Sequence, residues 1–485
     1  MHSAAQRLVL RKPIAGSLSL HIPSKPTLSS SLPPSRLLIS DVQRRFLTIP
    51  GSCRPQFGNL VKYNNSQRFG LRCFPKREHG ERQAGGDIYF ATSRGLSTMS
   101  EKRINMKPYS TTRGLFEVEK HIVPAFPIRE HPRALWNDGD LLQLVVNHYK
   151  PVNNPNPQDG DVTLLCAHAN GFHKEIYEPF FEALVEEYEK KGSKIRGIWF
   201  ADFHTQGDSG VVNEGKLGGD ISWFDHCRDL LSLINHFPKD IVRPIAAIGH
   251  SMGATQLFRL SVMHPTLFTC IVGLDPTISP ISPFPEHANP IIASAKRRDI
   301  WPSREDAIKF FKSRPWYQDW DPEALDIHMQ YGLRKLPTPL YPDVTKVEGG
   351  ENAVTLTTTK HQECFTFWRT TIQDRTDTRD MFRLLKEVKT PVCYIQGGTS
   401  VINYGENNKW KMEQTPKPCE MHILPGVGHM VPQEKPRETA EVAADYIHRR
   451  VKIWGKQMED YKADWPATTT MSPQFFEIRK RETKL

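Results

Sequence analysis

The sequence predicts an α/β fold in which a mostly parallel β-sheet is covered by helices on both faces. Two observations support this prediction. Short apolar segments typical of buried strands alternate along the chain with longer amphipathic segments typical of helices. Such alternation gives strand–helix–strand units, whose strands lie parallel in one sheet. The chain has 485 residues, which is long enough for this sheet and for a further segment beside it.

The elements can be placed in order along the chain. Segment 162–167 is typical of a buried strand, and segment 179–188 carries Phe180, Phe181 and Leu184 on one side, as an amphipathic helix does. The other expected strands are at 142–146, 195–200, 245–248, 270–274, 391–395 and 420–424, and the other expected helices are at 223–237 and 254–260.

The clearest functional signal is the pentapeptide Gly-His-Ser-Met-Gly at 249–253, between an expected strand and an expected helix. Strand, Gly-x-Ser-x-Gly and helix form the nucleophile elbow of α/β-hydrolases. The sharp turn raises the Ser251 hydroxyl above the sheet and directs the Met252 N–H to the place where an oxyanion forms. We therefore predict Ser251 as the nucleophile and Met252 as one oxyanion donor, although the pentapeptide alone also fits an ordinary strand-to-helix turn.

A general base is expected at His429. This residue lies in the Gly-rich loop 425–432, which follows the expected last strand and leaves the side chain room to reach Ser251. An imidazole can accept the serine proton and return it to the leaving group. Since the chain contains 19 histidines, a loop histidine without a role is the alternative interpretation.

A second oxyanion donor is expected in the loop after segment 162–167, which reads His-Ala-Asn-Gly-Phe at 168–172. In α/β-hydrolases the loop after the third strand supplies this donor from its backbone. The N–H of Asn170 is our choice. A plain turn built on Asn-Gly is the alternative interpretation.

The acid that completes a Ser–acid–His triad has two candidates. An aspartate is expected after the strand at 391–395, but Ser400 stands there, and Glu406 is the nearest carboxylate. The earlier strand at 270–274 ends in Asp275, which also preserves the chain order serine, acid, histidine. We favour Asp275 over Glu406, with a strand-end carboxylate that caps the following turn as the structural alternative.

Five segments are expected along the chain. Residues 1–105 form a basic leader, 106–277 and 386–456 form the two parts of the α/β core, 278–385 form a helical lid, and 457–485 form a C-terminal tail. The lid segment interrupts the strand–helix alternation, because it is Pro-rich at first and then polar and helical. An insertion between late strands is where this fold carries its lid.

The charge of the chain is concentrated in the leader. Residues 1–98 contain 15 Lys or Arg and 4 Asp or Glu, a net charge of +11, so the remaining residues sum to +10 − 11 = −1. A balanced folded part argues against a nucleic-acid partner. A basic, Ser-rich and acid-poor leader fits an organelle transit peptide or a disordered extension. A true translation start at Met99 is the third interpretation.

Cysteine and hydropathy patterns exclude several classes of site. None of the eight cysteines forms a Cys-x-x-Cys pair, and three lie in apolar strands, which favours a reducing compartment without structural disulfides. The tetrapeptide at 361–364 offers metal-binding side chains without a second pair beside it. We therefore expect no metal and no cofactor. No apolar run approaches the ~20 residues of a membrane-spanning helix.

These residues resemble a known group. The loop at 168–175, the loop at 207–209 and the pentapeptide at 249–253 are similar to those of fungal α/β-hydrolases associated with toxin biosynthesis and of the yeast peroxisomal lipase. The resemblance covers roughly residues 110–485 and implies an α/β-hydrolase fold with a mostly parallel, doubly covered sheet and a helical lid. Two departures are His168-Ala169 in place of His-Gly, and Ser400 in place of the usual acid, which the yeast lipase shares.

The C-terminal residues Thr483-Lys484-Leu485 resemble the peroxisomal address Ser-Lys-Leu, with Thr in place of Ser. They predict a peroxisomal location through an import receptor. The leader instead favours mitochondria, and a chain without either signal would remain in the cytoplasm.

Together the residues predict a lidded serine hydrolase that cleaves an ester or thioester of a hydrophobic acyl chain. One alternative is a pathway hydrolase that cleaves a secondary-metabolite ester or an activated C–C bond. The other is a non-catalytic relative of the fold that binds a ligand or a partner.

Overall fold

The structure is a computed structural model that describes residues 104–282, 284, 289–371, 376–403, 405–464, 471 and 473–482. The possible start at Met99, the tail Thr483-Lys484-Leu485 and all but the last two residues of the expected leader lie outside these ranges. What the sequence predicts for those segments, including the peroxisomal or mitochondrial location, therefore stays a prediction.

A nine-stranded sheet forms the centre of the fold, in the order β1-β2-β3-β5-β4-β6-β7-β11-β12. Strands β5, β4, β6, β7, β11 and β12 pair in parallel, while β1, β2 and β3 add an antiparallel edge. The predicted mostly parallel sheet is confirmed. The strands are β1 (Tyr109–Ser110), β2 (Phe116–Pro124), β3 (Gln143–Pro151), β4 (Val162–Ala167), β5 (Ile195–Ala201), β6 (Ile245–His250), β7 (Cys270–Leu274), β11 (Val392–Gly397) and β12 (Cys419–Leu424).

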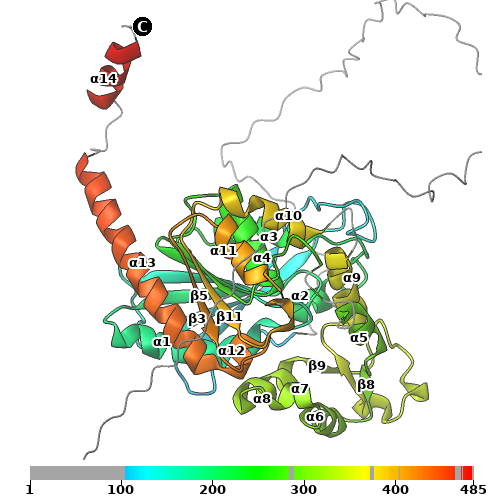
Figure 1. Ribbon diagram of the computed structural model, residues 1–485. Coiled ribbons are helices and arrows are strands. Elements are labelled where there is room, and N and C mark those ends of the chain that lie inside the picture. The colour runs from blue at the N-terminus through cyan, green and yellow to red at the C-terminus, as the bar shows by residue number, and fades with distance from the viewer. Residues whose placement is uncertain are drawn as a thin grey trace, which may run out of the picture. The chain divides into compact units, whose positions relative to one another are not determined.

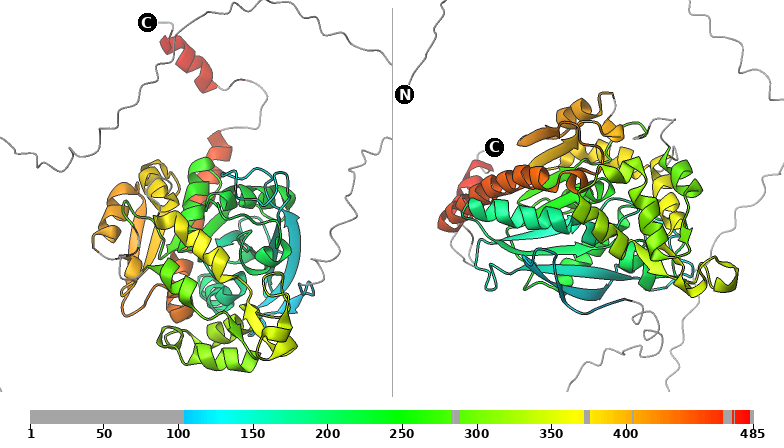
Figure 2. Two further views of the ribbon diagram at one scale, coloured as in Figure 1. Left: turned by 90° about the vertical axis from the view of Figure 1, so that its right-hand side faces the viewer. Right: turned by 90° about the horizontal axis from the view of Figure 1, so that it is seen from below.

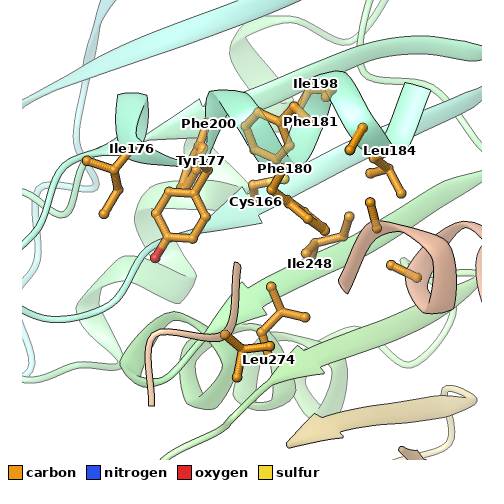
Figure 3. Packing of buried hydrophobic residues seen from close by; sticks show 14 of the residues in the cluster. Cys166, Ile176, Tyr177, Phe180, Phe181, Leu184, Ile198, Phe200, Ile248 and Leu274 are labelled. Carbon is orange, nitrogen blue, oxygen red and sulfur yellow. The ribbon is translucent and has the colours of Figure 1, made fainter. Parts of the chain in front are cut away.

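Helices cover both faces of this sheet, because successive strand residues point to opposite sides. Cys166 and Ile248 pack into the cluster beneath α1 (Glu178–Lys190) and α13 (Pro436–Asp464) (Figure 3). Their neighbours Leu165 and Ala247 belong to the opposite cluster, with α3 (Asp225–His236), α4 (Met252–Met263) and α10 (Asp377–Leu384). Figure 1 shows the two helical layers with the sheet between them.

The insertion lies between β7 and β11, and its helices and strands gather beside the sheet (Figures 1 and 2). It contains a small antiparallel sheet, in the order β8-β10-β9, that the sequence prediction of a helical lid did not include. Its elements are α5 (Pro290–Lys296), β8 (Ile300–Trp301), α6 (Arg304–Lys312), α7 (Pro315–Gln318), α8 (Pro322–Tyr331), β9 (Leu333–Lys335), η4 (Val344–Lys346), η5 (Gly350–Asn352), β10 (Val354–Leu356) and α9 (Lys360–Thr371).

The ends of the insertion and of the core differ from the expected boundaries. Helix α10, inside the expected lid, packs Met381 into the core cluster, and helix α13 continues to Asp464, beyond the expected boundary at 456. The remaining elements are η2 (Lys174–Tyr177), α2 (Gly207–Val212), η6 (Leu385–Glu387), η7 (Val401–Asn403), α11 (Asn407–Gln414), α12 (Val431–Glu434) and α14 (Pro473–Glu482). Within the described residues, no helix combines the length and apolar composition that crossing a membrane requires.

The topology brings the predicted site residues to one edge of the sheet. Parallel strands end at the same edge, and ligands of open α/β sheets bind outside those carboxyl ends. Ser251 follows β6, Asp275 follows β7, and His429 lies in the loop after β12. The candidate site is therefore built from three strand ends that are far apart in the sequence.

Candidate active site

The turn between β6 and α4 is strained in the way a nucleophile elbow requires. Ser251 has φ 54° and ψ −113°, a backbone conformation that residues other than glycine rarely adopt. The two glycines allow it. A Cβ on Gly249 would lie 2.5 Å from the Cα of Ala254, and one on Gly253 would lie 2.2 Å from the carbonyl oxygen of Ala167. The sequence prediction of an elbow at this position agrees with this geometry.

Ser251, His429 and Asp275 form a continuous hydrogen-bonded chain. The His429 Nε2 lies 2.9 Å from the Ser251 Oγ, and the His429 Nδ1 lies 2.6 Å from Asp275 Oδ2. This is the arrangement in which an imidazole can accept a serine proton while a carboxylate stabilises the resulting imidazolium. The Ser251 hydroxyl also contacts the hydroxyl of Thr277 at 2.9 Å.

Asp275, the acid that the sequence favours, lies beside the end of β11, where an aspartate would be expected and Ser400 stands instead. Strands β7 and β11 are parallel neighbours, with Leu274 opposite Ile395, so their ends lie side by side. The Gly397 N–H donates to Asp275 Oδ1 over 3.2 Å, and the Ser400 hydroxyl donates to Oδ2. Ser400 therefore supports a carboxylate that comes from the adjacent strand.

The electrostatic environment keeps Asp275 ionised. Complete burial by itself would raise the pKa of this carboxyl. The hydrogen bond and positive charge of His429, the charge of Lys411 and the hydrogen bond from Ser400 outweigh burial, and the pKa lies below its ordinary value. A carboxylate in this state can hold the imidazole in one tautomer.

Glu406, the alternative acid, lies elsewhere. Its side chain is exposed and pairs with the exposed Lys409 at 3.2 Å. None of its described hydrogen bonds reaches His429. The geometry thus joins Asp275, and not Glu406, to the histidine.

The loop at 168–172, which we call the oxyanion loop, leaves one amide available. The Ala169 N–H donates to the Tyr177 hydroxyl, and the Gly171 N–H donates to Gln206 Oε1, each over 2.9 Å. Among the hydrogen bonds of the described residues, none uses the N–H of Asn170 or that of Met252. These are the two donors that the sequence predicts, and Asn170 lines the same cavity as Ser251.

A chain of buried hydrogen bonds connects the oxyanion loop to the loop after β12 that carries His429. Sequence reasoning did not predict these hydrogen bonds. The Tyr177 hydroxyl accepts from the Ala169 N–H and donates to His250 Nδ1, each over 2.9 Å. The His250 Nε2–H then donates to the His429 carbonyl over 2.8 Å. Burial lowers the pKa of His250 to about 3, so this ring is neutral and its tautomer is fixed. Both loops are thus held to the elbow itself.

A cavity of about 640 Å³ opens beside Ser251 and His429. Most of its wall is apolar and comes from the oxyanion loop, the insertion and the loop after β11. The apolar lining includes Phe172, Phe284, Ile292, Trp316, Tyr317, Phe367, Val401 and Met430. The polar part of the lining includes Ser251 and His429, the charged Lys296, and the ion pair between Arg297 and Glu363. Such a cavity suits a hydrophobic ligand.

Two clusters of metal-binding side chains occur among the described residues, away from this cavity. Glu119, His121 and His148 lie on the antiparallel strands β2 and β3. Cys393, Glu420 and His422 lie on β11 and β12, and burial raises the pKa of the Cys393 thiol, which disfavours the thiolate that a metal would need. The tetrapeptide at 361–364 belongs to neither cluster.

Lys411 is a buried cation close to the acid, and no sequence pattern singled it out. It is 1% exposed, and its Nζ donates to the Pro276 carbonyl over 3.2 Å. Burial lowers the pKa of this ammonium to about 8, against the opposing effect of the Asp275 charge. Holding the charge at neutral pH therefore costs stability.

Lys411→Met is expected to raise the free energy of unfolding at pH 7 by up to about 3 kcal/mol. One pKa unit corresponds to about 1.4 kcal/mol, and folding lowers the pKa of Lys411 from 10.5 to about 8. Between these pH values the unfolded chain binds more protons, so wild-type stability rises with pH through this window. The advantage of the variant is therefore largest below pH 8 and disappears above about pH 10.5. Denaturant unfolding across this pH range measures it.

Lys409→Met in the same helix is the matched control. Lys409 is exposed, so its replacement should change stability by less than ~0.5 kcal/mol at every pH. A Lys411→Met protein less stable than wild type at pH 7 would contradict the prediction. It would show that the contacts of the ammonium outweigh the cost of burying it.

Comparison with known proteins identifies relatives of this chain. The model of the Alpha/beta hydrolase family matches residues 164–442. The chain is 31% identical over 404 residues to the type I acyl-CoA thioesterase mpaH' of Penicillium brevicompactum, covering 72% of this chain and 91% of that protein. It is 34% identical over 373 residues to mpaH of Penicillium roqueforti, covering 65% and 84%.

Two further similarities match the resemblance seen in the sequence. The abhydrolase domain-containing protein ACTT2-1 of Alternaria alternata is 28% identical over 246 residues, covering 44% of this chain and 89% of that protein. The solved structure of the peroxisomal alpha-beta-hydrolase Lpx1 of Saccharomyces cerevisiae superposes with a TM-score of 0.58 at 19% identity, covering 76% of this chain and 98% of that one. This last similarity concerns the fold.

Proposed function

The chain belongs to the alpha/beta hydrolase family and is a hydrolase, and we propose that it cleaves the thioester bond between coenzyme A and a hydrophobic acyl group. The observation that carries this proposal is the hydrogen-bonded chain Ser251–His429–Asp275, which opens into a large and mostly apolar cavity. We choose a thioester as the substrate because its Penicillium relatives are named type I acyl-CoA thioesterases.

Acylation follows from the geometry. The Ser251 oxygen attacks the thioester carbonyl while His429 Nε2 accepts the hydroxyl proton. Negative charge develops on the carbonyl oxygen, and the N–H groups of Met252 and Asn170 stabilise it. The C–S bond then breaks, and His429 gives its proton to the departing sulfur. The products are free coenzyme A and an ester of Ser251.

Deacylation repeats these steps with water. His429 accepts a proton from a water molecule, whose oxygen attacks the Ser251 ester through the same oxyanion site. The C–O bond to Ser251 breaks, and the proton on His429 returns to the serine oxygen. Asp275 stabilises the imidazolium in both halves of the reaction. The acid leaves from the apolar cavity, and the enzyme is restored.

The test compares a series of saturated acyl-CoA substrates with the p-nitrophenyl esters of the same acids. Release of thiol is measured for the first and of nitrophenol for the second. We expect thiol release, with kcat/KM rising about fourfold per added CH₂ until the cavity is full, because burying each CH₂ is worth about 0.8 kcal/mol. Turnover of the esters without any thiol release would refute the thioesterase and favour the ester-cleaving alternative.

A further inference from the structure

The side-chain amide of Gln206 lies buried against the oxyanion loop. It is fully inaccessible to solvent. Its Oε1 accepts the Gly171 N–H over 2.9 Å. Its Nε2 donates to Asn170 Oδ1 and, over 3.2 Å, to the hydroxyl of Thr366. An amide nitrogen has two hydrogens, so both are used. The single side chain thus connects the segment after β5, to which Gln206 belongs, with the oxyanion loop and with α9.

One of those segments is α9 of the insertion, which also contacts the oxyanion loop directly. The Asn170 Nδ2 donates to the Glu363 carbonyl over 3.2 Å. The contact is close, because a Cβ on Gly171 would lie 2.9 Å from the carboxylate carbon of Glu363. Gly171 has φ 86°, which favours glycine at this point. Helix α9 therefore holds the loop through Thr366 and through Glu363.

These contacts determine how Asn170 is oriented. Gln206 and Glu363 engage both ends of its side-chain amide, and Gln206 engages the amide of Gly171 that follows it. What remains is the backbone N–H of Asn170, the group assigned to the oxyanion. Its direction depends on the torsion angles that these hydrogen bonds fix.

We infer that Gln206 is a positioning residue for the oxyanion hole, and that through Thr366 it makes the placement of Asn170 depend on α9. The inference rests on the proposed function. Helix α9 also lines the acyl cavity with Glu363 and Phe367. An acyl chain packed against α9 thus contacts the helix that holds the oxyanion donor. Binding energy from the chain can therefore lower the barrier of the chemical step, so acyl preference should appear in kcat and not only in KM.

Thr366→Val tests the connection to α9. The substitution keeps the shape of a side chain that is completely buried and removes the hydroxyl. We expect kcat for acyl-CoA hydrolysis to fall about tenfold with KM within about twofold. Gln206→Met removes all three hydrogen bonds and should lower kcat about 10²-fold, the lower end of the loss expected for an oxyanion donor.

A second readout separates positioning from packing. A trifluoromethyl ketone with the same acyl chain adds to Ser251 and places an oxyanion in the hole. Its inhibition constant should rise in proportion to the loss of kcat/KM in both variants. A plain alkyl methyl ether of equal length, which forms no oxyanion, should bind all three proteins equally.

Thr355→Val is the matched control. Thr355 is a buried threonine of β10 in the same insertion, and its hydroxyl donates to the Asp299 carbonyl over 2.7 Å. The Thr366 hydroxyl likewise donates to a backbone carbonyl, that of Gln362, over 2.8 Å. The control therefore loses the matching hydrogen bond without any contact to Gln206, and kcat should stay within twofold of wild type.

Three results would overturn the inference. One is an unchanged kcat and ketone affinity in Thr366→Val. Another is a change in KM alone, which would assign to α9 only a role in shaping the cavity. The third is an equal loss in Thr355→Val, which would indicate general loosening of the insertion. Should Gln206→Met fail to fold, Thr366→Val decides. Thiol release by the wild-type protein reports separately on the proposed function.

Discussion

Ser251→Ala is expected to lower kcat for acyl-CoA hydrolysis by roughly 10⁴–10⁶-fold, the range seen when a triad nucleophile is removed. The substitution removes the only oxygen that both contacts His429 Nε2 and opens into the acyl cavity among the described residues. Residual turnover should come from the oxyanion donors and binding alone. Labelling by a fluorophosphonate probe should also disappear, since the probe reacts at the serine oxygen.

The thermal stability of this variant should stay close to wild type, because one small hydroxyl is lost and the elbow glycines remain. Ser261→Ala in the same helix is the matched control. Its hydroxyl donates to the Phe258 carbonyl over 2.7 Å, far along α4 from the elbow. It should keep full turnover and full labelling. Hydrolysis by Ser251→Ala at the wild-type rate would refute the assignment of Ser251 as the nucleophile.

Asp275→Asn is expected to lower kcat by roughly 10²–10⁴-fold. The carboxylate holds the proton of His429 on Nδ1, which leaves Nε2 free to accept the serine proton. An amide in its place can donate to the ring and favour the wrong tautomer, and it brings no charge to stabilise the imidazolium. Steady-state kinetics with a saturating acyl-CoA measures the effect.

Glu406→Gln provides the comparison for this variant. Its exposed side chain pairs only with Lys409 among the described residues, so kcat should stay within about twofold. If Glu406→Gln proved more damaging than Asp275→Asn, the acid would have to be reassigned to Glu406, and the loop after β11 would have to move on substrate binding.

Local patterns explain why most of the core could be predicted. The parallel strands other than β12 are short and largely apolar runs, since a strand buried on both faces needs few polar positions. Strand β12 carries Glu420 and His422 and is only partly buried. The elbow could be recognised for a related reason, because Gly249 and Gly253 are required by backbone contacts within a few residues. Strand β2 was missed although Phe116 and Val118 alternate there with charged residues and are both buried. That signal was present in the sequence.

The rest of the site depends on contacts between distant segments. The sequence favoured Asp275 from its strand end and its place in the chain order, but the role of Ser400 needed the register of β7 against β11, which brings this serine within reach of a carboxylate 125 residues earlier. Gln206 and Lys411 lie in polar stretches where burial is not expected, yet the fold buries Gln206 against the oxyanion loop and α9, and Lys411 against the segment after β7. The strands of the insertion are two or three residues long, too short for any periodicity to show.

The origin of the acid on β7 has an evolutionary consequence. The loop after β11 does not carry the catalytic acid, but it contributes Val401 to the wall of the cavity beside Ser251. Chemistry and selectivity are thereby assigned to separate pieces of chain at this edge of the sheet. Exchanges at Val401 can remodel the cavity while Ser400 and Lys411 keep their places beside Asp275. Selection on the shape of the cavity can therefore act at this loop while the catalytic acid stays in place.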